Sequence, residues 1–156
     1  MNMNVKMLAI TLLTTVSTLA QNNKQEFMEK ITINPWKWQN ERSYAQAVEV
    51  TKTEGTLYVS GQTAIDADGK SSTDSMKSQL IQSIQNLEHV IKEAGYETKN
   101  IVRLNIYTTS SEELFKSFDV LQKWITENEI KQASTLLEVN ALFATLKVEL
   151  EATVVK

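Results

Sequence analysis

The order of hydrophobic periods along the chain constrains its fold more than any other feature of the sequence. Five stretches alternate polar and apolar residues or are rich in β-branched and aromatic ones, as strands are, and two carry apolar residues at helical steps of three and four. The strand patterns lie at 44–51, 56–60, 100–109, 134–142 and 146–155, and the helical ones at 73–94 and from 110 to about 127. The order β-β-α-β-α-β-β predicts one α+β domain, in which two helices cover one face of a mixed β-sheet.

Local signals set the expected ends of these elements. Glu54-Gly55 supplies a turn, so 44–51 and 56–60 are predicted to form a hairpin. The first helix has capping residues at 71–74 and a stop at Gly95. Ser110, three residues before Glu113, forms the capping box of the second helix. The apolar stripe expected on that helix comprises Leu114, Phe118, Leu121 and Ile125, widened by Phe115 and Trp124.

One predicted strand has a polar face that needs a partner. In 100–109, Val102, Leu104 and Ile106 point to one side of the sheet, and the other side carries Arg103, Asn105 and Tyr107. Such a face meets water, a ligand or another subunit. With both helices on the opposite face, the sequence favours oligomerisation through the uncovered one.

The N-terminal twenty residues resemble a secretory signal. Lys6 is the only charge before Lys24, an apolar run follows it, and Thr18 and Ala20 are small residues at the −3 and −1 positions of a cleavage site before Gln21. We therefore expect a signal peptide at 1–20, a polar tether at 21–33 and the domain at 34–156, exported to a periplasm or to the medium. The alternative is a cytoplasmic protein whose first helix is apolar.

Composition excludes several chemistries. The 156 residues include no cysteine and one histidine, His89, which falls near the polar side of the first helix. Thiolate metal sites, cysteine nucleophiles and His-pair metal sites are therefore excluded. The acidic loop around Asp66 and Asp68 lacks the later ligands of a calcium-binding EF-hand, so neither metal nor cofactor is expected. A net charge of −3 argues against nucleic acid as a partner.

Two tryptophans near the start of the domain, Trp36 and Trp38, allow two interpretations. They form either a hydrophobic clasp over the edge of the core or an aromatic lip on a ligand pocket.

Four motifs stand at 58–63 (YVSGQT), 85–95 (QNLEHVIKEAG), 100–107 (NIVRLNIY) and 148–152 (VELEA). In their residues, order and spacing they resemble the RidA/YjgF family of reactive-intermediate deaminases, once classed as L-PSP endoribonucleases. The resemblance implies a chorismate-mutase-like fold and a homotrimer with small-molecule clefts between subunits. It also implies hydrolysis of enamines and imines such as 2-aminoacrylate.

The resemblance further implies site residues. Glu149 matches the glutamate thought to activate water, Tyr44 a tyrosine that closes the cleft, and Gly61 the loop that lines it. The family's carboxylate-binding arginine, in the motif Pro-Ala-Arg-(Ser/Thr), is replaced, because Gln132-Ala133-Ser134-Thr135 stands there. Ser134 and Thr135 are therefore expected to bind a ligand by hydrogen bonds.

Arg103 could supply a replacement cation, or it could make an ion pair between subunits. Three functions follow from these residues. They are a hydrolase of small C=N compounds with an arginine-free site, a trimer that binds a small metabolite without chemistry, and, ranked last, a ribonuclease. The partners expected are a small molecule at subunit interfaces and further copies of the chain, with no membrane after signal cleavage.

Overall fold

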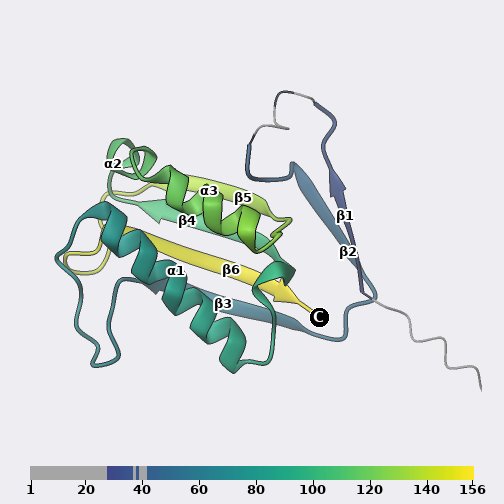
Figure 1. Cartoon of the computed structure of the whole chain (residues 1–156), viewed down its shortest axis with the longest axis horizontal. Helices are drawn as coiled ribbons and strands as arrows, with labels where there is room; N and C mark the ends of the chain where they lie inside the picture. Colours follow the sequence, from purple (N-terminus) through teal and green to yellow (C-terminus); the bar gives the residue numbers. More distant parts are fainter. Residues whose placement is uncertain (1–27, 37, 39–41) are drawn as a thin grey trace, which may run out of the picture.

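The computed structural model describes residues 28–36, 38 and 42–156 (Figure 1). The predicted signal peptide and residues 21–27 of the predicted tether lie outside this range. The elements, in chain order, are β1 Glu29–Ile33, β2 Ala47–Thr51, β3 Thr56–Thr63, α1 Met76–Glu93, the 3-10 helix η2 Thr98–Asn100, β4 Ile101–Thr108, α2 Ser111–Phe115, α3 Phe118–Glu127, β5 Ala133–Glu138 and β6 Val148–Val155.

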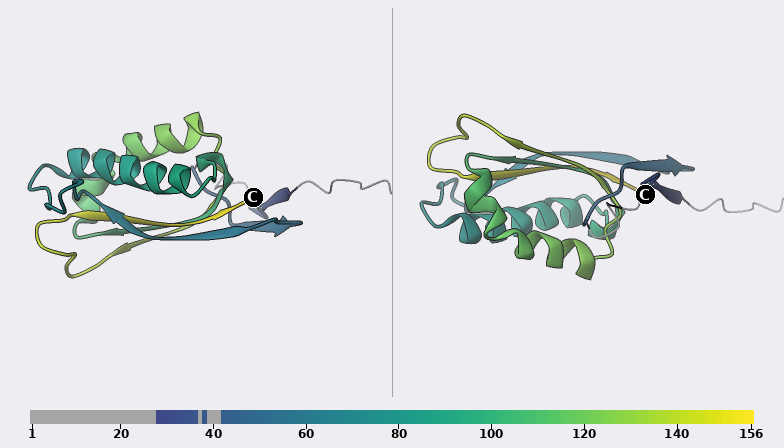
Figure 2. Two further views of the ribbon diagram at one scale, coloured as in Figure 1. Left: turned by 90° about the horizontal axis from the view of Figure 1, so that it is seen from below. Right: turned by 90° about the horizontal axis from the view of Figure 1, so that it is seen from above.

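The main sheet has four strands in the order β3-β6-β4-β5. β6 is antiparallel to both of its neighbours, and β4 and β5 are parallel, so the sheet is mixed. The helices lie on one face of it, and its other face is uncovered (Figure 2). This confirms the α+β class and the arrangement of helices that the sequence predicts.

The core lies between α1, α3 and the helix-facing side of the sheet. On α1, apolar side chains at three- and four-residue steps are buried, as the periodicity predicts: Met76, Leu80, Ile84, Leu87 and Ile91. They pack in one cluster with Leu104 and Ile106 of β4 and Leu150 of β6. Among the described residues, no helix is long and apolar enough to cross a membrane.

The predicted hairpin of 44–51 with 56–60 is wrong. β2 pairs instead with β1, antiparallel, and β3 pairs with β6. In the predicted turn, the backbone amides of Glu54 and Gly55 donate to the carbonyl of Lys156, which follows β6. Residues 29–33, expected in the tether, form β1 and satisfy the backbone groups of β2.

The predicted second helix is interrupted. α2 ends at Phe115 and α3 begins at Phe118, with Ser117 buried between them. The break shifts the helical phase, so Leu114, Leu121 and Trp124 are buried as expected while Phe115 is 60% exposed, contrary to the prediction. The Ser110 cap is confirmed, because its Oγ accepts from the Glu113 amide at 3.2 Å.

Candidate functional site

The uncovered side of the main sheet, which we call the open face, gathers polar side chains from three strands. On β4 it carries Arg103, Asn105 and Tyr107, as the alternation predicts. The register places Asn105 opposite Glu151 of β6, and Tyr107 opposite Glu149. Paired residues of neighbouring strands point to the same side, so the two glutamates share this face with the β4 side chains.

A chain of hydrogen bonds crosses the open face. The Arg103 guanidinium donates to Thr135 Oγ1 at 2.5 Å and to Asn105 Oδ1 at 2.9 Å. The Asn105 amide donates to Glu151 Oε2 at 3.4 Å, and the Tyr107 hydroxyl donates to the same oxygen at 2.9 Å. Arg103 and Thr135, both predicted site residues, are therefore joined directly, and Glu151 is held by two donors.

Tyr107 is electrostatically tied to the glutamates. Its hydrogen bond to Glu151 raises the pKa of the phenol above its ordinary value, with further contributions from burial and from the negative charges of Glu151 and Glu149. The phenol therefore stays protonated and keeps donating to Glu151 throughout the physiological pH range.

Glu149 and Gly61, two further predicted site residues, lie together. The pairing of β3 with β6 shifts register between Val59 and Gln62, so Gly61 lies in a β-bulge. The Glu149 side chain occupies the space beside Gly61 where another residue would carry its Cβ, and an added Cβ would collide with the carboxylate. None of the described residues donates a hydrogen bond to Glu149, in contrast to Glu151. Its carboxylate is thus available to a ligand or to water.

Ser134 lies on the other side of the sheet from this group. It pairs with Leu104, which is fully buried toward the helices, and its hydroxyl accepts from Gln132 Nε2 at 3.3 Å. Within one copy of the chain, Ser134 therefore lies away from Glu149.

Hydrogen bonds of Gln132 connect the backbone on either side of Tyr44 to Ser134. The backbone beside Tyr44 pairs with the start of β5, since the Ala45 amide donates to the Gln132 carbonyl at 2.8 Å, and Gln132 Nε2 donates to the Ser43 carbonyl at 2.7 Å. The predicted site residues thus form two groups. Glu149, Gly61, Arg103 and Thr135 lie on the open face, and Tyr44 and Ser134 lie at the β5 edge.

The two tryptophans stack on each other rather than on the core. The ring centroids of Trp36 and Trp38 are 6.3 Å apart, and both side chains are more than half exposed. They do not belong to the core cluster, so the clasp interpretation is wrong. The guanidinium of Arg42 lies 5.7 Å from the centroid of the Trp38 ring.

Two residues of these groups, Glu151 and Gln132, were not among the predicted site residues. Glu151 lies two positions after Glu149, so strand alternation was a sufficient signal for it. Gln132 is buried, and its role at the β5 edge has no signal in the hydrophobic pattern, which treats glutamine as a surface residue.

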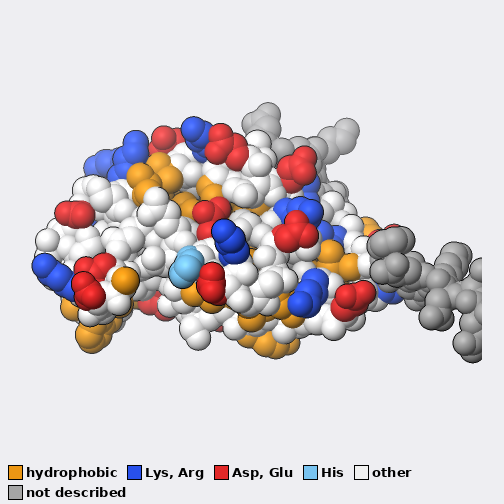
Figure 3. Space-filling view, turned by 60° about the horizontal axis from the view of Figure 1, so that its bottom comes forward, with side chains coloured by type: hydrophobic (Ala, Val, Ile, Leu, Met, Phe, Trp, Pro, Cys, Tyr) orange, Lys and Arg blue, Asp and Glu red, His pale blue; other side chains and the backbone are white. Residues whose placement is uncertain are grey.

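His89 is exposed on α1, as predicted, and cationic and anionic side chains are interspersed around it on the face that Figure 3 shows. Among the described residues, no three His, Cys, Asp or Glu side chains are grouped to hold a metal ion.

Comparison with known proteins identifies the family. The model of a family described as "Endoribonuclease L-PSP" matches residues 37–156. The chain belongs to this family. A RutC family protein of Aquifex aeolicus is 31% identical over 113 residues, which are 72% of this chain and 88% of that protein.

Solved structures agree on the fold. YyfB of Yersinia pestis, described as a Rid family protein of unknown function, superposes with a TM-score of 0.72 at 26% identity and covers 81% of this chain and 98% of its own. Escherichia coli TdcF, solved with bound serine, gives a TM-score of 0.61 at 19% identity over 72% of this chain and 87% of its own. The RidA/YjgF fold that the motifs predicted is thereby confirmed.

Proposed function

We propose that this protein hydrolyses small, uncharged imines or enamines, with Glu149 as the residue that activates water. The observation that carries the proposal is the position of the Glu149 carboxylate, which lies over Gly61 on the open face and receives no hydrogen bond from the described residues. A carboxylate with free lone pairs can accept a proton from water, as a general base does.

The proposed reaction balances with water alone. A water oxygen bonds to the carbon of the C=N group while Glu149 takes one of the water protons, and the nitrogen takes a proton from solvent, which gives a carbinolamine. Glu149 then gives its proton to that nitrogen, and the C–N bond breaks with its electron pair on nitrogen. The hydroxyl proton passes to solvent, so ammonia and a carbonyl compound are released and the carboxylate is regenerated.

The choice of an uncharged substrate rests on Ser134, which would share a ligand with Glu149 where two copies of the chain meet. A serine replaces the arginine that would bind a substrate carboxylate in the related motif, and its hydroxyl carries no charge. Arg103, the nearest candidate for a replacement, already donates to Thr135 and Asn105. A charge-assisted hydrogen bond contributes about 1.5–3 kcal/mol, so losing the arginine contact disfavours amino-acid-derived imines.

A second candidate function is binding without chemistry. The absence of arginine at position 134 favours it, and TdcF, whose structure contains serine, shows that a protein of this fold holds a small ligand. A ribonuclease is disfavoured, because the one histidine is exposed on α1, in the layer of helices opposite the open face.

One assay distinguishes hydrolysis from binding. Imines are generated in situ, both the charged 2-iminopropionate and a carboxylate-free ketimine, and their loss is followed spectroscopically. We expect the wild type to accelerate hydrolysis of the ketimine and Glu149→Gln to lower the rate by about 10²–10⁴-fold, the usual contribution of general acid–base catalysis. Ser134→Arg tests whether the charged imine becomes a substrate.

Glu93→Gln is the matched control. Glu93 is exposed at the end of α1, so the same change of charge there should leave the rate unaltered. Equal loss of activity in both variants, or a wild type no faster than buffer, would overturn the catalytic proposal. Saturable ligand binding without acceleration would support the second candidate.

We also propose that the chain is exported, with cleavage before Gln21. The support is the basic start, apolar run and small-residue end of the first twenty residues. Intact mass of the protein from its native host tests this, since a chain that still begins at Met1 would contradict it.

A further inference from the structure

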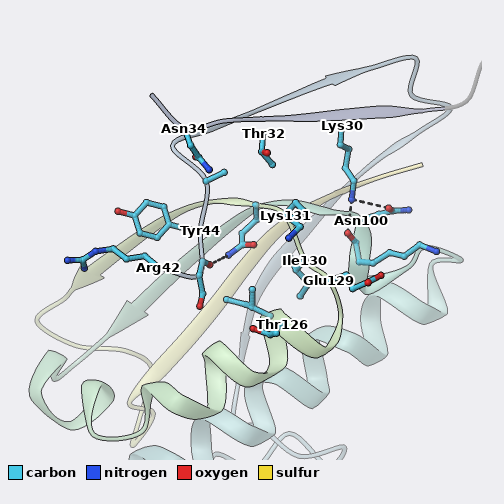
Figure 4. Close-up of a pocket in the computed structure, with 15 residues that line it drawn as sticks. Lys30, Thr32, Asn34, Arg42, Tyr44, Asn100, Thr126, Glu129, Ile130 and Lys131 are labelled. Atoms are coloured by element: carbon cyan, nitrogen blue, oxygen red, sulfur yellow. Dashed lines mark hydrogen bonds between the residues drawn. The ribbon is translucent and has the colours of Figure 1, made fainter. Parts of the chain in front are cut away.

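A concave site lies between the β1–β2 hairpin and the body of the domain. This hairpin cavity, of about 1060 Å³, is bounded by β1 on one side and by the end of α3 and the start of β5 on the other (Figure 4). Lys30, Asn100, Lys131 and Gln132 line it, as does Tyr44, one of the predicted site residues. Glu149 and Gly61 do not line it, so anion binding there does not depend on the proposed hydrolysis.

The walls of the hairpin cavity are strongly cationic. Lys30, Arg42, Lys99 and Lys131 line it, and Glu129 is the one carboxylate among its lining residues. Lys99 is partly neutralised outside the cavity, because its ammonium lies 2.6 Å from Glu97. The whole chain has a net charge of −3, so this concentration of positive charge runs against its average. Such a local field attracts anions.

Lys30 is held in place rather than mobile in solvent. Its Nζ donates to the Lys99 carbonyl at 2.7 Å and to Asn100 Oδ1 at 3.2 Å, which anchors β1 to η2. An ammonium has three donors, so one remains for a ligand. Burial lowers the pKa of Lys30, and so do the charges of Lys99 and Lys131, against an opposing effect of Glu97. A bound anion would relieve this repulsion.

Gln132 adds a buried acceptor to the cavity wall. Its side chain is 1% exposed, and its Oε1 has no hydrogen-bond partner. The amide orientation is fixed by its other end, since Nε2 donates to the Ser43 carbonyl at 2.7 Å and to Ser134 Oγ. Leaving a buried acceptor without a partner is unfavourable, so a ligand that donates a hydrogen bond to Gln132 Oε1 would stabilise the folded protein.

We propose that the hairpin cavity binds a small organic anion of two or more negative charges that also carries a hydroxyl or N–H donor. The lysines supply charge to the anionic groups, and Gln132 Oε1 accepts from the donor. Ammonium groups act as point charges and accept phosphate and carboxylate oxygens alike, so a phosphate ester and a hydroxylated polycarboxylate share the required chemistry.

Calorimetric titration of the purified chain at low ionic strength tests this, with ribose 5-phosphate, citrate, sulfate and uncharged ribose as probes. We expect saturable binding of ribose 5-phosphate or citrate, weakened by added salt, and none of ribose. The tighter of the two anions tells whether phosphate or carboxylate is preferred. Lys30→Gln and Lys131→Gln should each weaken binding roughly two- to fivefold, as expected for partly exposed charge pairs.

Two variants keep the test specific. Lys70→Gln makes the same change of charge in the turn after β3, remote from the hairpin, and should leave the dissociation constant unchanged. Gln132→Leu should weaken the hydroxylated anions and spare sulfate, which has no donor. If Lys30→Gln fails to fold, the dissociation constant measured for Lys131→Gln still tests the proposal, because Lys131 is exposed. No saturable binding of either organic anion at millimolar concentration, or equal weakening by Lys70→Gln, overturns the proposal.

Discussion

At the scale of single residues, Gly61 and Glu149 depend on each other. The carboxylate of one fills the space that the other leaves by having no side chain. We predict that Gly61→Ala destabilises the protein by about 1–3 kcal/mol, the usual cost of overpacking. In the background of Glu149→Ala the same substitution should cost much less, because the colliding atoms are gone.

Urea unfolding of the four proteins in this double-mutant cycle measures the coupling. An equal cost of Gly61→Ala in both backgrounds would show that the backbone, rather than the Glu149 side chain, requires glycine at this position. That result would contradict the claim that the Glu149 side chain excludes a Cβ at position 61.

Tyr107 provides a prediction for pH. Its folded-state pKa is raised above the ordinary value of 10.0, chiefly by the hydrogen bond to Glu151. A raised folded-state pKa contributes stability that is fully present below the unfolded-state pKa and is lost as pH rises through the folded-state pKa. We therefore expect stability to fall above about pH 10 and Tyr107→Phe to lessen that fall.

Absorbance titration of the phenolate checks it. The chain has four tyrosines, and Tyr107→Phe should remove a component that titrates late. Glu151→Gln should bring that component down in pH by removing the charged acceptor. A late component that survives Tyr107→Phe would contradict the assignment.

Residue identities could be predicted from the sequence better than their surroundings. Alternation placed Arg103 on a polar face, and the family motif pointed to Glu149 and Gly61. The side of the sheet on which Ser134 lies depends on the register of β5 against β4, and the unsatisfied acceptor of Gln132 depends on the path of the chain around Tyr44. Both are tertiary facts with no local signature.

At the scale of elements, a buried glutamine connects α1 to the loop before β6. Gln79 is fully buried, its Nε2 lies 3.1–3.3 Å from the carbonyls of Ser72, Asp74 and Thr145, and its Oε1 accepts from the Lys147 amide at 2.8 Å. We predict that Gln79→Leu, in which the new side chain is close in volume, destabilises the protein by about 2–4 kcal/mol. The substitution leaves several buried backbone groups without hydrogen-bond partners.

Gln85→Leu is the control on the same helix. Gln85 is exposed, so its replacement should change the free energy of unfolding by no more than about 0.5 kcal/mol. Comparable unfolding midpoints for the two variants would show that the loop does not depend on Gln79.

The hydrophobic periodicity predicted which segments form helices and which form strands, but it could not predict which strands pair with each other. A strand pattern shows which face is buried and says nothing of which strand lies alongside. The hairpin prediction failed for this reason, since β2 pairs with β1 and β3 pairs with β6. The break between α2 and α3 could not be predicted from the hydrophobic pattern either, because apolar residues continue across it at 114–121.

At the scale of the whole molecule, the open face is the side of the main sheet that the helices leave uncovered (Figure 2). It exposes Tyr58 of β3, at 79%, on the same side of the sheet as Thr153, its pairing partner. Helices cover the other face completely enough to bury Leu104 and Leu150. An uncovered sheet face that exposes both apolar and polar side chains can be buried against the same face of further copies of the chain.

We predict that the protein is a trimer that associates through the open face. Light scattering after size-exclusion chromatography should give three times the chain mass for the wild type and a smaller species for Tyr58→Arg, which introduces a charge at the proposed interface. Phe115→Arg is the matched control, because Phe115 is also an exposed aromatic, at 60%, but lies on α2 in the layer of helices. A wild-type monomer, or a trimer that Phe115→Arg dissociates and Tyr58→Arg does not, would place the contact elsewhere and remove the reason for a site shared between subunits.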